Sequence, residues 1–289
     1  MAKIVGYILF ALVSFVISLY LTFPWDAARE LVQKEVSKAV GATVAAEKLE
    51  PSWLTGIHAE AIEIELPDSE EPLKLDALDA RISVLSLLSG AKGGTARVPM
   101  AQGVIEAEAE VTDARAEVEA DIVDIELALI PALKAATGLA LAGEVDADAQ
   151  LDIGIADVGT TAGNIHLTGT GLEVLEGSQA GGFPIPALVL GSLDWTIPIE
   201  GGKAKITNQT LSGPTVEASV NGEIVLAKPF GRSLMNLKLR FKPTPEFLRK
   251  EPLLGSLLNN LSRYRSPDGF YGYQVTGTVK RPRFTPTRG

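Results

Sequence analysis

Side chains that could carry catalytic chemistry are scarce in this chain. It contains no cysteine and only two histidines, His58 and His166, so disulfides, zinc thiolates and thiol nucleophiles are excluded. Each histidine lies at a polar position of an alternating stretch, where an exposed side chain is the simplest interpretation. A Ser–His–Asp site can be assembled from them only by assumption. We therefore expect no catalytic residue and no enzymatic activity.

Carboxylates at alternate positions are the second candidate chemistry. Glu106, Glu108 and Glu110 form one such series, and Asp146, Asp148 and Asp152 form another. Alternate residues of a strand are about 7 Å apart, and the glycine turn of a calcium loop is missing, so solvated strand faces are favoured over a metal site. Residues 169–174 lack the third glycine and the following helix of a phosphate-binding motif. The sequence predicts no metal and no cofactor.

The charge of the chain restricts its partners. Residues 24–289 contain 25 of the 26 Lys and Arg and all 36 Asp and Glu, which gives this part a formal charge of −11. Nucleic-acid-binding proteins present basic faces, so we expect no nucleic-acid partner. An acidic surface is also a poor electrostatic match for anionic lipid head groups.

The elements that must position any site begin with an apolar run of twenty residues without a charge, from Ile4 to Phe23. A helix of that length spans about 30 Å, the hydrocarbon thickness of a bilayer. A cleaved signal peptide is the alternative, but its apolar core is shorter and a small-residue cleavage site follows it. Here bulky residues follow, and Trp25 is suited to the membrane interface.

The sequence therefore predicts three parts: a transmembrane anchor with a short cytoplasmic N-terminus at 1–23, an amphipathic linker helix at 24–42, and a β-rich periplasmic domain at 43–289. Lys3 on the N-terminal flank favours this orientation by the positive-inside rule. We expect the linker helix to cover 25–40 and to end at Gly41. It either holds the domain close to the bilayer or packs on the core of the domain.

From Thr43 onward the dominant hydrophobic period is two, which indicates antiparallel strands with one apolar and one wet face. The fold class is mainly β, a long curved antiparallel sheet with a few flanking helices. Gly-rich turns are expected at 90–94, 181–182 and 201–202. Helices are expected at 127–137 and 245–262, either as lids over the apolar sheet face or as ordinary core. The basic end, which holds Lys280, Arg281, Arg283 and Arg288, is expected to solubilise an edge strand.

Several motifs of the chain resemble known families. The anchor, residues 21–24, Val40–Gly41, Val44, Leu49, Trp53 and Gly56–Ile57 look like the opening of AsmA-like inner-membrane proteins. Residues 130–143, 201–206, 222–226, 267–271 and 277–282 resemble the N-protein family of bacterial type II secretion (the general secretion pathway). The resemblance covers nearly the whole length through loose Gly, Pro and apolar patterns. It implies a single-pass inner-membrane protein with a periplasmic domain, and it brings no catalytic residue.

Two classes of function follow from that resemblance. The chain is either an assembly component of the secretion apparatus, whose partners are other secretion components, or an AsmA-like module that carries phospholipid acyl chains between the two membranes. A closed core and an open apolar groove would distinguish them, and small inward residues such as Ala107 and Ala149 fit both. The candidate groove residues are Ile62, Ile64, Leu151, Ile153, Ile155, Trp195 and Ile197.

Overall fold

The computed structural model describes residues 43–288 except 53–54, 66–72, 84–85, 87–91, 131–132, 135–136, 181–182 and 261. The predicted anchor and linker helix therefore lie outside the described residues, together with Ile4, Phe23 and Trp25. None of the helices that the structure does describe is long and apolar enough to cross a bilayer.

Fourteen strands form one antiparallel sheet in which almost every strand pairs with its neighbour in sequence. The strands run from β1 to β8 and, after a short two-stranded excursion, from β11 to β16. Their bounds are β1 Thr43–Ser52, β2 Gly56–Glu65, β3 Leu73–Ser83, β4 Lys92–Met100, β5 Gly103–Val111, β6 Arg115–Glu126, β7 Leu141–Gly154, β8 Ala162–Val174, β9 Ser178–Ala180, β10 Phe183–Ile185, β11 Leu188–Glu200, β12 Lys203–Ser212, β13 Val216–Val225, β14 Leu234–Pro243, β15 Tyr271–Thr278 and β16 Arg281–Arg288. The prediction of a long antiparallel sheet is confirmed.

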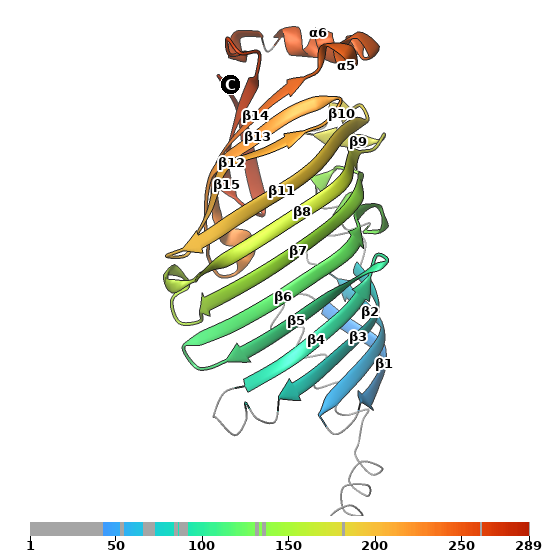
Figure 1. Ribbon diagram of the computed structural model, residues 1–289, viewed down its shortest axis with the longest axis vertical. Helices are drawn as coiled ribbons and strands as arrows, with labels where there is room; N and C mark the ends of the chain where they lie inside the picture. Colours follow the sequence, from blue (N-terminus) through green and yellow to red (C-terminus); the bar gives the residue numbers. More distant parts are fainter. Residues whose placement is uncertain are drawn as a thin grey trace, which may run out of the picture.

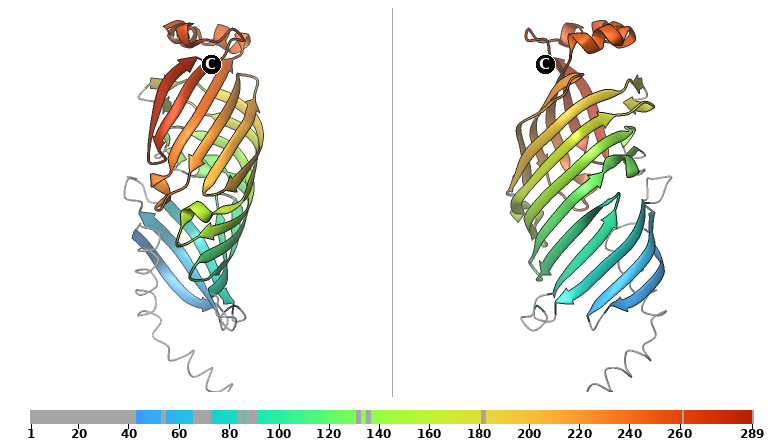
Figure 2. Two further views of the ribbon diagram at one scale, coloured as in Figure 1. Left: turned by 90° about the vertical axis from the view of Figure 1, so that its left-hand side faces the viewer. Right: turned by 45° about the vertical axis from the view of Figure 1, so that its right-hand side comes forward.

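The sheet is strongly curved. In Figure 1 strands β4–β8 and β11 cross the front of the molecule, and in Figure 2 both ends of the sheet turn toward the same side. Register shifts occur between Ile122 and Ile125, between Ala142 and Glu144, and between Ile206 and Gln209. Each shift contains a residue with positive φ: Asp124, Gly143 and Asn208. Such bulges bend a strand and increase its twist. They account for curvature of the sheet at β6–β8 and at β12–β13.

Few helices accompany the sheet. Helices α5 (Pro245–Lys250) and α6 (Pro252–Asn260) lie beyond the strand ends at the top of Figure 1 and confirm the predicted helical segment. Thr244 caps α5 by accepting a hydrogen bond from the Phe247 N–H. Short 3₁₀ turns occur at η1 Leu127–Leu129, η2 Val158–Thr160, η3 Phe230–Arg232 and η4 Ser262–Tyr264. Of the helix predicted at 127–137, the structure describes residues 127–130, 133–134 and 137. Residues 127–129 form η1, and 133, 134 and 137 are helical.

The predicted glycine turn at 201–202 is confirmed, whereas the one predicted at 90–94 is wrong at Gly93 and Gly94. Gly201 and Gly202 have φ of +58° and +68° and join β11 to β12, as a tight hairpin requires. Gly93 and Gly94, in contrast, lie inside β4 and pair with Glu110 and Ala109. A Cβ on Gly94 would approach the Arg81 carbonyl oxygen to 2.7 Å, so close contact with β3, not a turn, explains this glycine.

Candidate functional site

A row of alanines crosses the apolar side of the sheet at right angles to the strands. Ala80 of β3 pairs with Ala96 of β4, which pairs with Ala107 of β5. The row continues through Ala120 of β6 and Ala149 of β7. Five neighbouring strands therefore place a methyl group at the same level, over about 19 Å at the usual strand spacing.

Larger side chains flank this alanine row on both sides. One flank contains Val98, Ile105 and Ile122 and ends at Ala147, and the other runs from Ala109 through Val118 to Leu151. All of these side chains, like the five alanines, are half-buried. The apolar side of β4–β7 is therefore a low strip of alanines between taller rows, and we call it the open apolar face.

The open apolar face is not a closed core. From Gly103 to Val111 in β5, and from Leu141 to Ile153 in β7, no apolar side chain is fully buried. Contacts between the described elements run mostly between hydrogen-bonded neighbours of the sheet. Side chains converge on the inner side of a curved sheet, and the apolar set is the more buried one, so we infer that this face lies on the concave side seen in Figure 2.

The structure brings together four of the seven predicted groove residues. Leu151 and Ile153 lie on β7, and Trp195 and Ile197 lie on β11, on the same side of the sheet. Trp195 pairs with Leu167 of β8, and its indole N–H donates to the Thr210 carbonyl of β12 at 3.0 Å. The four side chains are half-buried.

The other three predicted groove residues lie elsewhere. Ile62 and Ile64 are on β2, five strands and about 24 Å of sheet from β7, and Ile62 is buried at 3% exposure. Ala59, also 3% exposed, is three residues away, because Ala61 has a φ of +49° and changes the phase of the alternation. Ile155 follows the end of β7 and donates its N–H to Ala114 across a turn, so it is not a strand residue.

The opposite side of β5–β7 is a dense array of carboxylates. The cross-strand register sets Glu108 against Glu119, Glu110 against Glu117, and Asp121 against Asp148. Like charges directly opposite one another weaken a sheet. Arg97 offsets part of the charge by pairing with Glu106 at 2.5 Å, and Arg115 pairs with Asp152. These side chains are mostly exposed, as the interpretation of solvated faces predicted.

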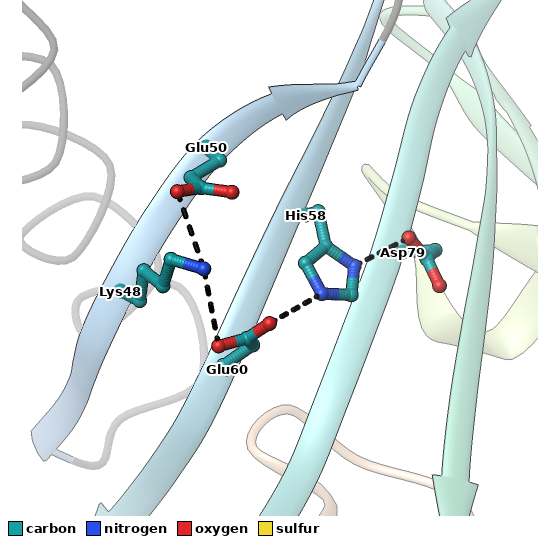
Figure 3. Close-up of polar contacts among 5 residues, drawn as sticks. All are labelled: Lys48, Glu50, His58, Glu60 and Asp79. Carbon is teal, nitrogen blue, oxygen red and sulfur yellow. Dashed lines mark hydrogen bonds and ion pairs between the residues drawn. The ribbon is translucent and has the colours of Figure 1, made fainter.

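Both histidines bridge carboxylates on this polar side, a role that sequence reasoning missed. His166 contacts Asp194 through Nε2 at 2.8 Å and Asp148 through Nδ1 at 3.1 Å. His58 contacts Asp79 through Nδ1 at 2.7 Å and Glu60 through Nε2 at 3.3 Å (Figure 3). Ionised carboxylates only accept hydrogen bonds, so each histidine makes both contacts as hydrogen bonds when its imidazole is protonated and positively charged.

The carboxylates of each cluster favour the protonated form of its histidine. The hydrogen bond that His166 donates to Asp194, helped by the bond to Asp148, raises the pKa of His166 above 6.5 against a smaller opposing effect of burial. The hydrogen bond to Asp79 does the same for the pKa of His58, against a smaller opposing effect of burial. Lys48 extends the second cluster by pairing with Glu50 at 3.2 Å and Glu60 at 3.4 Å (Figure 3). These clusters join neighbouring strands, and neither places a nucleophile beside its histidine.

Across the described residues, no group of three or more His, Asp or Glu side chains has the arrangement of a metal site. Comparisons of the chain with protein-family models, with curated proteins and with solved structures found no match in any of the three. The open apolar face is therefore the candidate site on the strength of its own geometry.

Proposed function

We propose that this chain is a non-enzymatic component of a bacterial type II secretion system, anchored in the inner membrane by residues 4–23, with its sheet in the periplasm. In this proposal the open apolar face binds an apolar ligand, either a lipid acyl chain or an apolar segment of a partner. The resemblance of five stretches to the secretion N-protein family supports a role in that system; the stretches are 130–143, 201–206, 222–226, 267–271 and 277–282. The open apolar face supports the proposed mode of action.

The observation that carries the proposal is that most apolar side chains of β4–β7 are half-buried and not enclosed in a core. Exposed apolar surface costs about 25 cal/mol for each Å² left in water. Contiguous apolar surface that stays in contact with water is a feature of ligand-binding grooves and of protein or membrane interaction sites. Because the alanine row is continuous across five strands, it suits a ligand that is long and narrow.

A second candidate function is lipid transfer between the inner and outer membranes, as in AsmA-like proteins. The alanine row favours it, because Ala80 to Ala149 offer a uniform surface without a polar group that would fix one ligand position. A ligand could slide along such a surface. In a secretion component, by contrast, the same face would hold one partner segment in place.

The test places a charge on the open apolar face. Ile153→Asp should leave the fold intact, because water reaches this half-buried position. The wild-type full chain should co-purify with lipid, measured by mass spectrometry, and the Ile153→Asp variant should not. Gln150→Asp is the matched control, since it adds the same charge to the exposed opposite side of β7. Ile206→Asp should unfold the domain, because Ile206 is only 7% exposed and a buried unpaired charge costs several kcal/mol.

Three outcomes decide between the candidates. Loss of exoprotein secretion in the Ile153→Asp strain supports the secretion component. Unchanged secretion combined with altered outer-membrane permeability supports lipid transfer and defeats our first choice. If Ile153→Asp unfolds the domain as Ile206→Asp does, the face is a closed core and both candidates lose their structural support.

A further inference from the structure

An exposed apolar patch with cations beside it lies where β13 meets β14 and β15 meets β16. Val225 and Leu234 face each other across the β13–β14 pair and are 36% and 56% exposed. Phe230 of η3 is 61% exposed. Leu234 also pairs with Thr278, which pairs with Arg281. We call Val225, Phe230, Leu234, Arg232, Arg281 and Arg283 the basic tip.

The basic tip is held in a fixed conformation. Ser233 is fully buried, and its hydroxyl accepts a hydrogen bond from the Ala227 N–H at 3.0 Å. Its backbone N–H donates to the Phe230 carbonyl at 2.9 Å. The β15–β16 turn is tied to the same loop, because the Lys280 N–H donates to the Gly231 carbonyl at 3.0 Å. These bonds present the Phe230 ring to solvent on an ordered loop, which reduces the entropy cost of binding.

The cations of the basic tip are not compensated. Arg232, Arg281 and Arg283 are exposed, and none of them pairs with a carboxylate of the described chain. Residues 224–245 contain five Lys or Arg and no Asp or Glu, and residues 269–289 contain four and none. The chain is acidic as a whole, but these two segments form a basic region. The poor electrostatic match with anionic lipid that was expected for the whole domain does not apply to this region.

We propose that the basic tip docks on an anionic lipid surface. Apolar side chains that enter the head-group region, with arginines beside them, are the usual composition of an interfacial membrane contact. A second copy of the chain is a poorer partner. Its carboxylate array, from Glu106 to Glu110 and from Glu117 to Asp121, would match the arginines, but of the large exposed apolar side chains only Val123, 44% exposed, lies beside it for Phe230 and Leu234 to pack against.

This inference goes beyond the proposed function, and it does not require that the open apolar face binds lipid. The basic tip uses residues of η3, β13, β14 and β16, whereas the open apolar face uses β4–β7. Loss of lipid from Ile153→Asp would leave tip docking intact. Failure of tip docking would in turn leave the lipid content of the purified chain unchanged.

The experiment measures the capture of vesicles by the full chain held in nanodiscs of phosphatidylcholine. Flotation should show binding to phosphatidylcholine vesicles that contain phosphatidylglycerol, and weak binding to vesicles of phosphatidylcholine alone. Arg281→Ser with Arg283→Ser should reduce binding about fivefold for each cation removed. Phe230→Ser should also reduce it, and high salt should weaken the wild-type protein toward the level of the arginine variant.

Two control variants match these changes elsewhere in the molecule. Leu129→Ser removes another large side chain that is 48% exposed, and Lys92→Ser removes an exposed cation of β4. Both should bind vesicles as the wild-type chain does. Equal binding to neutral and anionic vesicles, or unchanged binding by the tip variants, overturns the proposal. Salt-sensitive self-association that the tip variants abolish, with no vesicle capture, would assign the basic tip to a second copy instead.

Discussion

Two regions of one sheet handle the same apolar alternation in different ways. In strands β4–β7 the apolar side is rich in alanine and mostly half-buried, and Ile125 of β6 is its one buried large side chain. In strands β12–β15 several of the corresponding side chains are buried, with Ile206 at 7%, Val216 at 6% and Val275 at 8% exposure, while those of β14 are half-buried. The comparison shows that period-two patterning identifies which face is apolar, but it does not say whether anything covers that face.

The covering of the C-terminal strands has a local cause. Bending is not that cause, because bulges bend β12 at Asn208 and the central strands at Asp124 and Gly143 alike. Rings fill this region instead, because Phe241 stacks on Tyr271 and Tyr273 with centroids 5.7 and 6.2 Å apart. Alanines of the central strands are too short to make such contacts.

The largest loss of stability is expected when a buried side chain of the C-terminal region, Phe247, is truncated. This residue of α5 is 7% exposed, so Phe247→Ala should lower the free energy of unfolding by about 3–5 kcal/mol through lost burial and a cavity. Leu129→Ala, at a site 48% exposed, should change it by less than about 0.5 kcal/mol. Urea unfolding followed by tryptophan fluorescence measures both. Similar small losses for the two variants would mean that the C-terminal core is as open as the central strands.

A smaller effect is expected when the two regions receive the same enlargement. Ala204→Leu in β12 should cost about 1–3 kcal/mol, since Ala204 is 7% exposed and its surroundings are packed. Ala149→Leu in the alanine row should be nearly neutral for stability, because that side chain is half-buried on an open face. The Ala149 variant should nevertheless lose bound lipid. Equal destabilisation by both changes would contradict an open central face.

The smallest expected effect is a difference in pH dependence between the regions. In the central strands the raised pKa of His166 means that its stabilising charge is complete below pH 6.5 and is lost as pH rises through the folded-state value. His166→Gln should therefore destabilise the protein more at pH 5.5 than at pH 8.5. A constant difference in melting temperature between the variant and the wild type across this range would contradict a charged bridge to Asp148 and Asp194.

In the C-terminal strands, the stabilising effect of Asp268 depends on pH in the opposite direction. The Ser266 hydroxyl and then the Arg240 guanidinium lower the pKa of Asp268 from 3.8 to about 2. That contribution is present above pH 3.8 and is lost as pH falls toward 2. Asp268→Asn should have a constant effect between pH 5.5 and pH 8.5, so it serves as the control for His166→Gln. The effect of Asp268→Asn should shrink only in strong acid.

The sequence predicted the larger features of the fold because they depend on local rules. Three local patterns each specify an element by themselves: alternation in 145–155 and 273–279, a glycine pair at 201–202, and the proline-broken apolar stripe at 245–262. The glycines at 93 and 94 were misassigned, since close approach of a neighbouring strand leaves the same residue type as a turn does. The phase change at Ala61 was missed because a positive φ at alanine has no sequence signature.

The candidate site and the basic tip depended on tertiary structure instead. The sequence by itself determined that the chain is acidic, without cysteine, and alternating over most of its length. Only the register decided that Ala80, Ala96, Ala107, Ala120 and Ala149 form one row, and that His166 stands between two carboxylates. The reason is physical: cross-strand neighbours are chosen by hydrogen bonding between distant segments, and burial depends on which side chains the folded sheet brings together.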